Sequence, residues 1–183
     1  MLFAKPGAEN SQKTVEIAIE AARQRGVKRL VVSSSSGASA DLLAPYLDEF
    51  EIVVIGQVTG FRPDGQNPMS QEKRQELRQK GFEVYHGTHV LSGAERAFSG
   101  RFQGVYPVEV MAYTLRMFSQ GVKVCVEIAT MALDGDLLQA GEDIIALAGT
   151  RRGLDTALYL QPAHAQKITE TKIHEILCKP RVD

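Results

Sequence analysis

The chain has 183 residues, a formal net charge of −1, and a composition that is 44% hydrophobic and 23% charged, which is typical of one globular domain. This balance excludes the strongly basic surface of proteins that bind nucleic acids or anionic membranes. Cys125 and Cys178 are too few and too far apart for a disulfide framework, and no stretch has the character of a signal peptide or a membrane span. These features predict a single-domain cytoplasmic protein. They leave open whether copies of the chain associate as a homo-oligomer.

Helical and extended patterns alternate along the chain. A helix is expected from Asn10 or Ser11, either of which can cap its start, to Gly26, which can end it. Further helices are expected over 38–47, 70–80, 107–118 and 122–133, with a closing helix over 168–177 that Pro180 stops. Short β-branched runs predict strands around Val31 and over 52–56, 82–85, 143–148 and 156–160. The stretch 87–103 is expected to be a loop with a single helical turn at 94–97.

Strands that alternate with helices predict an α/β fold, in which helices pack on a mainly parallel sheet. The connection between the last two expected strands is too short for a crossover, so these strands should pair antiparallel. In such sheets, ligands bind at the carboxyl ends of the parallel strands. Four loops are therefore expected to meet at that edge, at 33–39, 56–61, 85–92 and 149–155, together with Glu9 and Asn10 at the start of the first helix.

The loop at 33–39 is the strongest candidate for a binding element, because it joins a buried strand to a helix. Its small residues are Ser33, Ser34, Ser35, Ser36, Gly37 and Ser39. Backbone N–H groups at the start of a helix attract anions, serine hydroxyls add donors without bulk, and glycine allows positive φ or close approach. The alternative is a polar turn with a serine cap, which needs no ligand. Since the chain has neither a P-loop lysine motif nor G-x-G-x-x-G, the residues alone favour neither interpretation.

Residues of the other three loops complete the candidate site. Arg151 and Arg152 directly follow an expected strand, where an arginine can bind a phosphate through two hydrogen bonds. The remaining candidates can form a wall and donate hydrogen bonds. They are Thr59, Gly60, Phe61, Thr88, His89, Gly149 and Thr150.

His89 has three interpretations: a donor to a bound ring, a general base, or a hydrogen-bond partner of neighbouring backbone. The last is favoured, because no catalytic partner stands near it in sequence. His86 and His89 together have a spacing that zinc can use. No cysteine or clear carboxylate pair accompanies them, so a metal site is not expected.

Five further residues favour a structural interpretation. Lys123 and Glu127 are four residues apart in an apolar helix and should form an intrahelical ion pair. Glu95 and Arg96 are expected to be an ordinary surface pair. Cys125, in the same helix as Glu127, is expected to be an inert core residue.

Two groups of motifs resemble a known family. SGASA at 36–40, GEDII at 141–145 and AGT at 148–150 are similar to the C-terminal domain of pyruvate kinase, whose equivalent serine loop holds a phosphate of a sugar bisphosphate effector. GTHVLSGAER at 87–96, CVEIATMA at 125–132 and GTRRGLDTA at 149–157 are similar to stand-alone proteins that resemble this domain, and the likeness runs nearly end to end. It implies a three-layer α/β/α fold with a five-stranded, mainly parallel sheet in the order 3-2-1-4-5, of which strand 5 is antiparallel. The barrel that carries the phosphotransfer residues of pyruvate kinase is absent from the sequence, so that activity is not expected.

The stand-alone family is associated with bound flavin mononucleotide (FMN). The resemblance therefore implies FMN as the cofactor, with its phosphate on the serine loop and an oxidoreductase role as one interpretation. The alternative is a non-enzymatic sensor of a phosphorylated metabolite, similar to the effector domain of pyruvate kinase. An interaction module of an assembly is less favoured, because polar loops converge at one edge. A single phosphate loop suits a mononucleotide, since no second glycine-rich turn is present to hold a pyrophosphate.

Overall fold

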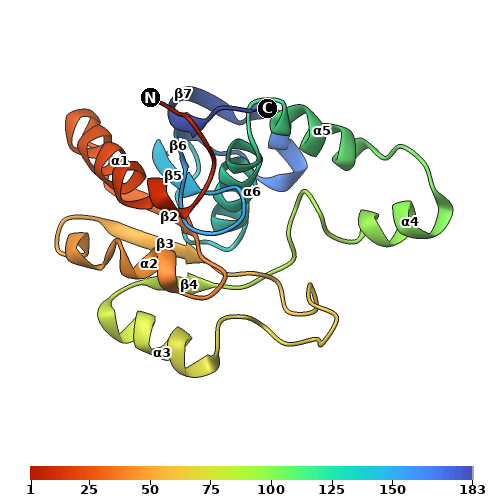
Figure 1. Cartoon of the computed structure of the whole chain (residues 1–183), viewed down its shortest axis with the longest axis horizontal. Coiled ribbons are helices and arrows are strands. Elements are labelled where there is room, and N and C mark those ends of the chain that lie inside the picture. The colour runs from red at the N-terminus through yellow and green to blue at the C-terminus, as the bar shows by residue number, and fades with distance from the viewer. Residues whose placement is uncertain (183) are drawn as a thin grey trace.

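Figure 1 shows the fold as a computed structural model that describes residues 1–182. A seven-stranded sheet has the order β1-β7-β6-β5-β2-β3-β4. Its strands are β1 (Leu2–Phe3), β2 (Arg29–Ser33), β3 (Glu51–Ile55), β4 (Glu83–Tyr85), β5 (Ile144–Ala148), β6 (Thr156–Gln161) and β7 (Lys172–Pro180). Strands β2, β3, β4 and β5 are parallel to one another. The antiparallel pairing of β5 and β6 confirms the prediction made from their short connection.

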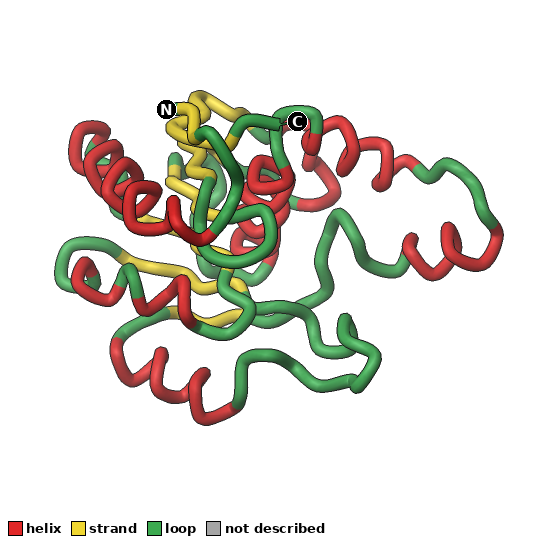
Figure 2. Tube along the Cα trace, in the orientation of Figure 1, coloured by secondary structure: helices red, strands yellow, loops and turns green. Residues whose placement is uncertain are grey.

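Helices cover both faces of the sheet, as Figure 2 shows. They are α1 (Ser11–Arg25), α2 (Ala38–Asp41), α3 (Gln71–Lys80), α4 (Glu95–Phe102), α5 (Pro107–Arg116) and α6 (Gln120–Asp134). Helices α1, α2 and α3 share the core of one face, whereas α6 covers the other face and carries α5 on its outer side. Helix α4 buries no residue and stands away from the body at the right of Figure 1. No helix within residues 1–182 combines the length and the apolar character needed to span a membrane.

The core has two halves because the strands alternate their side chains between the two faces. In β2, Leu30 and Val32 pack beneath α1, whereas Val31 packs beneath α6. In β5, Leu147 faces α1 and Ala146 faces α6. Burial on both faces explains why these strands are continuous apolar runs in the sequence. The expected three-layer arrangement is therefore present.

The closing helix expected over 168–177 is wrong. This stretch contains a 3-10 turn (Ala165–Glu170) followed by β7, which pairs with β6 on one side and with β1 on the other. The three-residue spacing of Ile173 and Ile176 imitates a helical face, but pairing with strands distant in sequence overrides it. Strands β1 and β7 raise the sheet from the expected five strands to seven.

Two further elements differ in length from the prediction. The helix expected over 38–47 ends at Asp41, and a 3-10 turn (Ala44–Tyr46) follows it. Pro45 explains the break, because its ring would clash with the carbonyl of Asp41, four residues earlier, in a continuing helix. The single turn expected at 94–97 is the longer helix α4.

The topology identifies one edge as the place for a site. The carboxyl ends of β2, β3, β4 and β5 lie at the same edge because these strands are parallel. The chain moves from β2 to β3 and β4 on one side, and returns through α4, α5 and α6 to β5 on the other side of β2. The order of strands thus reverses between β2 and β5, which is where α/β sheets bind ligands.

Candidate functional site

A cleft of about 1280 Å³ opens at this carboxyl edge. It is lined by residues from the loops after β2, β3, β4 and β5 and from α6, so the predicted meeting of the four loops is confirmed. Glu9 also lines it, whereas Asn10 does not. The predicted site residues that line the cleft are Ser33, Ser34, Ser35, Ser36, Ser39, Phe61, His89, Gly149, Thr150 and Arg151. The predicted residues outside its lining are Gly37, Thr59, Gly60 and Thr88.

The serine loop (residues 33–39) is held in shape by one of its own hydroxyls. Ser34 Oγ accepts hydrogen bonds from the backbone N–H groups of Gly37 (3.1 Å) and Ser39 (3.2 Å). These two backbone N–H groups lie at the start of α2, where the sequence predicts donors to a phosphate. Both already have an acceptor within the loop. The exposed Ser35 and Ser36 and the half-buried Ser33 and Ser39 leave their hydroxyls at the cleft. Because α2 is a single turn, its dipole contributes little to anion binding here.

Gly37 packs against Lys73 behind the serine loop. Its φ is +97°, and a Cβ at this position would meet the side chain of Lys73, with Cε at 2.7 Å and Cγ at 2.9 Å. Lys73 bonds Asp41 at 2.8 Å and Glu76 at 2.9 Å, and the hydrogen bond to Asp41 raises the pKa of the lysine. A side chain at Gly37 would therefore be directed at Lys73.

The loop after β5 is organised by a buried carboxylate. Asp155 Oδ2 accepts hydrogen bonds from the backbone N–H (3.1 Å) and the hydroxyl (2.7 Å) of Thr150, and from the backbone N–H of Gly7 (3.3 Å). Its Oδ1 accepts a bond from Thr156 Oγ1 at 2.9 Å. Thr150 thus helps to hold the loop after β5 in shape, and its hydroxyl proton is already donated to Asp155. Arg151 and Arg152 follow it and lie exposed at the rim of the cleft.

His89 lies on the cleft wall in a fixed orientation. Its Nε2 accepts a hydrogen bond from the backbone N–H of Val58 at 3.2 Å, as the favoured interpretation predicted. Burial lowers the pKa of His89, although the nearby Glu127 acts in the opposite direction. The ring therefore remains neutral near pH 7. Phe61 lies beside it, with ring centroids 6.3 Å apart, and Arg96 stands 5.9 Å from the Phe61 centroid.

An ion pair is buried in the part of the wall formed by α6. Lys123 Nζ donates to Glu127 Oε2 at 2.5 Å, and the two residues are only 3% and 4% exposed. Glu127 Oε1 also accepts from the backbone N–H of Leu91 at 2.9 Å, which ties the loop after β4 to α6. The intrahelical pair was predicted. Its place in the cleft lining was not, because sequence does not show which side of an apolar helix faces a cavity.

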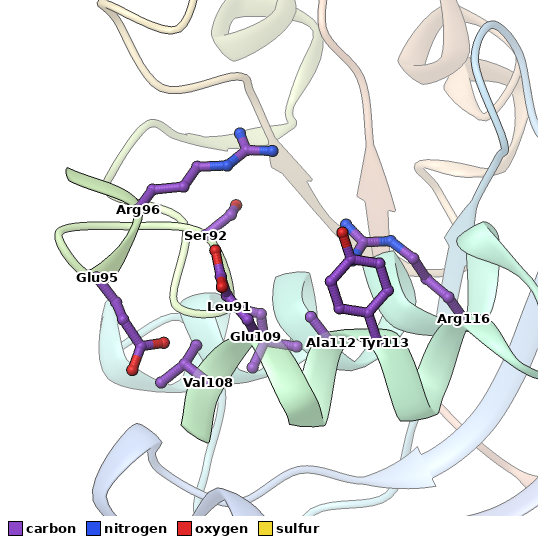
Figure 3. Close-up of a pocket in the computed structure, with 9 residues that line it drawn as sticks. All are labelled: Leu91, Ser92, Glu95, Arg96, Val108, Glu109, Ala112, Tyr113 and Arg116. Carbon is purple, nitrogen blue, oxygen red and sulfur yellow. The ribbon is translucent and has the colours of Figure 1, made fainter. Parts of the chain in front are cut away.

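Figure 3 shows a smaller cavity of about 50 Å³ that adjoins the cleft. Ser92, Arg96 and Arg116 line both spaces. The side chains of Glu95 and Arg96 point away from each other, so the surface pair expected between them is wrong. Glu95 turns toward Val108 instead.

The histidine and cysteine candidates for other chemistry lie in structural surroundings. A Cβ at Gly56 would lie 2.1 Å from His86 Nε2, so the ring packs directly on this glycine. Burial, with the charges of Arg74 and Arg78, lowers the pKa of His86 to about 4. Within residues 1–182, no group of three or more metal-binding side chains is present. Burial raises the pKa of the Cys125 thiol, which makes a thiolate nucleophile unfavourable.

Charge is distributed unevenly around the cleft. Two acidic side chains line it, Glu9 and Glu127, and the latter is already paired with Lys123. The six basic residues of the lining are Arg62, Arg96, Arg116, Lys123, Arg151 and Arg152. Arg96, Arg116 and Lys123 are neither predicted site residues nor adjacent to one, because they lie on helices whose orientation only the fold determines. This arrangement attracts an anion.

Comparison with known proteins finds a matching family model and solved structures of pyruvate kinases. The family model described as "Pyruvate kinase, alpha/beta domain" matches residues 12–158. Pyruvate kinase from Cryptosporidium parvum is 14% identical, with a TM-score of 0.38 over 79% of this chain and 21% of the enzyme. The same enzyme in complex with ADP is 15% identical, with a TM-score of 0.39 over 85% of this chain and 23% of the enzyme. The chain thus spans less than a quarter of the length of these pyruvate kinases. On the match over residues 12–158, it belongs to the pyruvate kinase alpha/beta domain family.

Proposed function

We propose that the cleft binds a phosphorylated small molecule. The observation that carries this proposal is the excess of cationic side chains on the lining, six basic against two acidic, in a chain whose net charge is −1. A charge excess of this kind in a concave site attracts and holds an anionic ligand. Membership of a family built on the pyruvate kinase alpha/beta domain is consistent with a ligand-binding or effector-like role.

The phosphate belongs at the junction of the serine loop and the loop after β5. These loops are neighbours because β2 and β5 pair directly in the sheet. Ser35 and Ser36 come from the first loop, Arg151 and Arg152 come from the second, and all four line the cleft. Serine hydroxyls and arginines together supply the hydrogen bonds and the charge that a phosphate requires.

FMN is the finer proposal for the ligand. Val124, Ile128 and Met131 lie on consecutive turns of α6 and give the cleft an apolar wall, to which Ile55 and Phe61 add. An apolar wall with a few polar groups at its edge suits a flat ring such as isoalloxazine. The cleft is also larger than the roughly 300–1,000 Å³ usual for small-ligand sites, which leaves space beside the ring for the second reactant that an oxidoreductase needs.

A sensor of a phosphorylated metabolite is the second candidate. It is favoured by the hydrogen bonds that already occupy Gly37 N–H, Ser39 N–H and the Thr150 hydroxyl, since they leave a site that binds mainly through charge. A sensor needs only a saturable pocket, whereas an oxidoreductase needs a ring and a second reactant. Ligand identity therefore separates the two candidates.

Calorimetric titration of the purified chain with FMN, and separately with ribose 5-phosphate, tests both candidates. We expect FMN to bind at about micromolar concentration, and the Arg151→Ala/Arg152→Ala variant to bind it at least about ten-fold more weakly, since charged hydrogen bonds contribute about 1.5–3 kcal/mol each. Arg101→Ala, an exposed arginine outside the cleft lining, is the matched control and should leave binding unchanged. Binding of the sugar phosphate without FMN supports the sensor. Failure to bind either compound would contradict the proposal.

A further inference from the structure

Lys123 is a buried cation on the wall of a ligand-sized cleft. An ammonium group has three N–H donors, and one of them is used by Glu127. No other acceptor among residues 1–182 lies within hydrogen-bonding distance of Nζ. Burying a charge is costly unless its hydrogen bonds are satisfied. The two remaining donors therefore need an acceptor that this chain does not supply.

Glu127 holds Lys123 in position and links it to His89. One carboxylate oxygen receives Lys123, and the other receives the backbone N–H of Leu91 at 2.9 Å and the Ser92 hydroxyl at 3.4 Å. The loop that carries His89 is thus fastened to α6 by the same carboxylate that orients the lysine. Lys123 and His89 both line the cleft, and they are neighbours there, because the charges of Glu127 and Lys123 both act on the pKa of His89.

His89 offers a further unused N–H donor. Because its Nε2 accepts the Val58 N–H, and because a neutral imidazole carries one proton, that proton is on Nδ1. Nδ1 has no hydrogen-bond partner in the described part of the chain. Because burial lowers the pKa of His89, the imidazole stays in this neutral form near pH 7. The imidazole is therefore a fixed N–H donor on the cleft wall.

These donors lie across the sheet from the phosphate position. The serine loop leads into α2, which packs on the α1 face, whereas Lys123 belongs to α6 on the opposite face. A ligand that contacts both the serine loop and Lys123 must extend over the carboxyl edge of the sheet. Arg96 and Arg116 line the same end of the cleft as Lys123, so an acceptor there with partial negative charge would also relieve the repulsion among three cations.

We propose that Lys123 and His89 form a second polar subsite, which binds a carbonyl oxygen on the ring of the ligand while the phosphate lies at the serine loop. This inference rests on the proposed function and narrows the ligand to a phosphate ester of a carbonyl-bearing heterocycle. Glu127 is the positioning residue of the subsite. The apolar stretch of α6 at Val124 and Ile128 adjoins Lys123 and gives the ring a surface to lie on.

The test compares three probes: FMN, riboflavin, which lacks the phosphate, and ribose 5-phosphate, which lacks the ring. The main variant is Lys123→Met/Glu127→Gln, because it removes the cation without leaving a buried carboxylate unpaired, and glutamine can still accept from Leu91. We expect its affinity for FMN and riboflavin to fall about ten-fold or more and its affinity for ribose 5-phosphate to stay unchanged. His89→Ala should give the same pattern with a smaller effect. The visible absorption band of bound flavin should shift relative to the wild type.

Lys13→Met/Glu16→Gln is the matched control, an exposed lysine–glutamate pair on α1 outside the cleft lining. It should behave as the wild type with all three probes. If Lys123→Met/Glu127→Gln keeps its circular dichroism and binds FMN as tightly as the wild type, the subsite is wrong. Wild-type binding of ribose 5-phosphate without either flavin would also overturn it while leaving the phosphate site intact. A wild-type chain that binds none of the three probes contradicts the proposed function itself.

Discussion

Gly153 lies where the loop after β5 touches the start of the first helix. Its φ is +72°, and a Cβ there would stand 2.6 Å from Ala8 Cα and 2.4 Å from Ser11 Oγ. Ser11 Oγ in turn donates to Ala8 O at 2.6 Å and accepts from Leu154 N at 2.9 Å. Two distant segments of backbone therefore meet at a point with no space for a side chain. This contact positions Arg151 and Arg152 at the rim of the cleft.

We expect Gly153→Ala to destabilise the fold by about 2–4 kcal/mol, as the sum of a left-handed backbone penalty and overpacking. Gly141→Ala separates the two effects, because Gly141 also has positive φ (+85°) but no atom within 4 Å of its Cβ position. It should cost only about 1–2 kcal/mol, from the backbone alone. Urea unfolding followed by circular dichroism measures both. Equal losses for the two variants would show that the contact with Ala8 and Ser11 is not tight.

Within the serine loop, one hydroxyl stabilises the loop itself and another is available to a ligand. Ser34 Oγ accepts two backbone N–H groups, whereas Ser36 is exposed on the cleft. We expect Ser34→Ala to lower stability by about 1–3 kcal/mol, because it leaves the Gly37 and Ser39 N–H groups without their acceptor. Ser36→Ala should change stability by less than about 0.5 kcal/mol and weaken phosphate binding several-fold. Chemical denaturation and titration with the same phosphate probe distinguish these outcomes. Loss of stability in both variants would refute the division.

The elements that local signals define were predictable from the sequence. Helix α1 begins at Ser11 and ends at Gly26, whose positive φ fits the predicted end, although Asn10 makes no side-chain cap at its start. Ser70 caps α3 by accepting from Lys73 N–H. The buried strands β2, β3 and β5 follow from continuous β-branched runs. Strand β7 was not predictable, because its partners β6 and β1 are set by the tertiary fold.

The candidate site also contains residues that the sequence predicts and residues that it does not. Parallel strands share a carboxyl edge, so the sequence order alone brought the serine loop, His89 and Arg151 into one cleft. Arg116, Lys123 and Glu127 were missed as lining residues because they are on helices, and the rotation of a helix about its axis is fixed by packing. Gly37 was assigned to the ligand because positive φ was anticipated correctly, but the position of Lys73 behind it depends on α3.

At the scale of the whole molecule, the uneven placement of charge is more informative than its total. The chain carries 21 basic and 22 acidic residues, which gives a net charge of −1. Several acidic groups are neutralised away from the cleft, in pairs such as Glu49 with Arg23 and Glu175 with Arg25. The cleft keeps its positive field because only Glu9 and Glu127 oppose six basic side chains there. The cleft should thus attract a small anion although the chain as a whole is nearly neutral.

This local field predicts that ligand affinity depends on ionic strength even though the molecule is nearly neutral. Raising NaCl from about 0.05 M to about 0.5 M shortens the Debye length from roughly 14 Å to roughly 4 Å, so the exposed arginines at the rim are screened from the phosphate. We expect affinity for a phosphorylated probe to fall about three- to ten-fold over this range, because several rim charges act together. The Arg151→Gln/Arg152→Gln variant should bind more weakly at low salt and show a shallower salt dependence, since the screened charges have been removed. Calorimetry at four salt concentrations gives both slopes. Parallel slopes for the wild type and the variant would mean that these two arginines do not face the bound phosphate, and that its charge is met deeper in the cleft by Arg116 and Lys123.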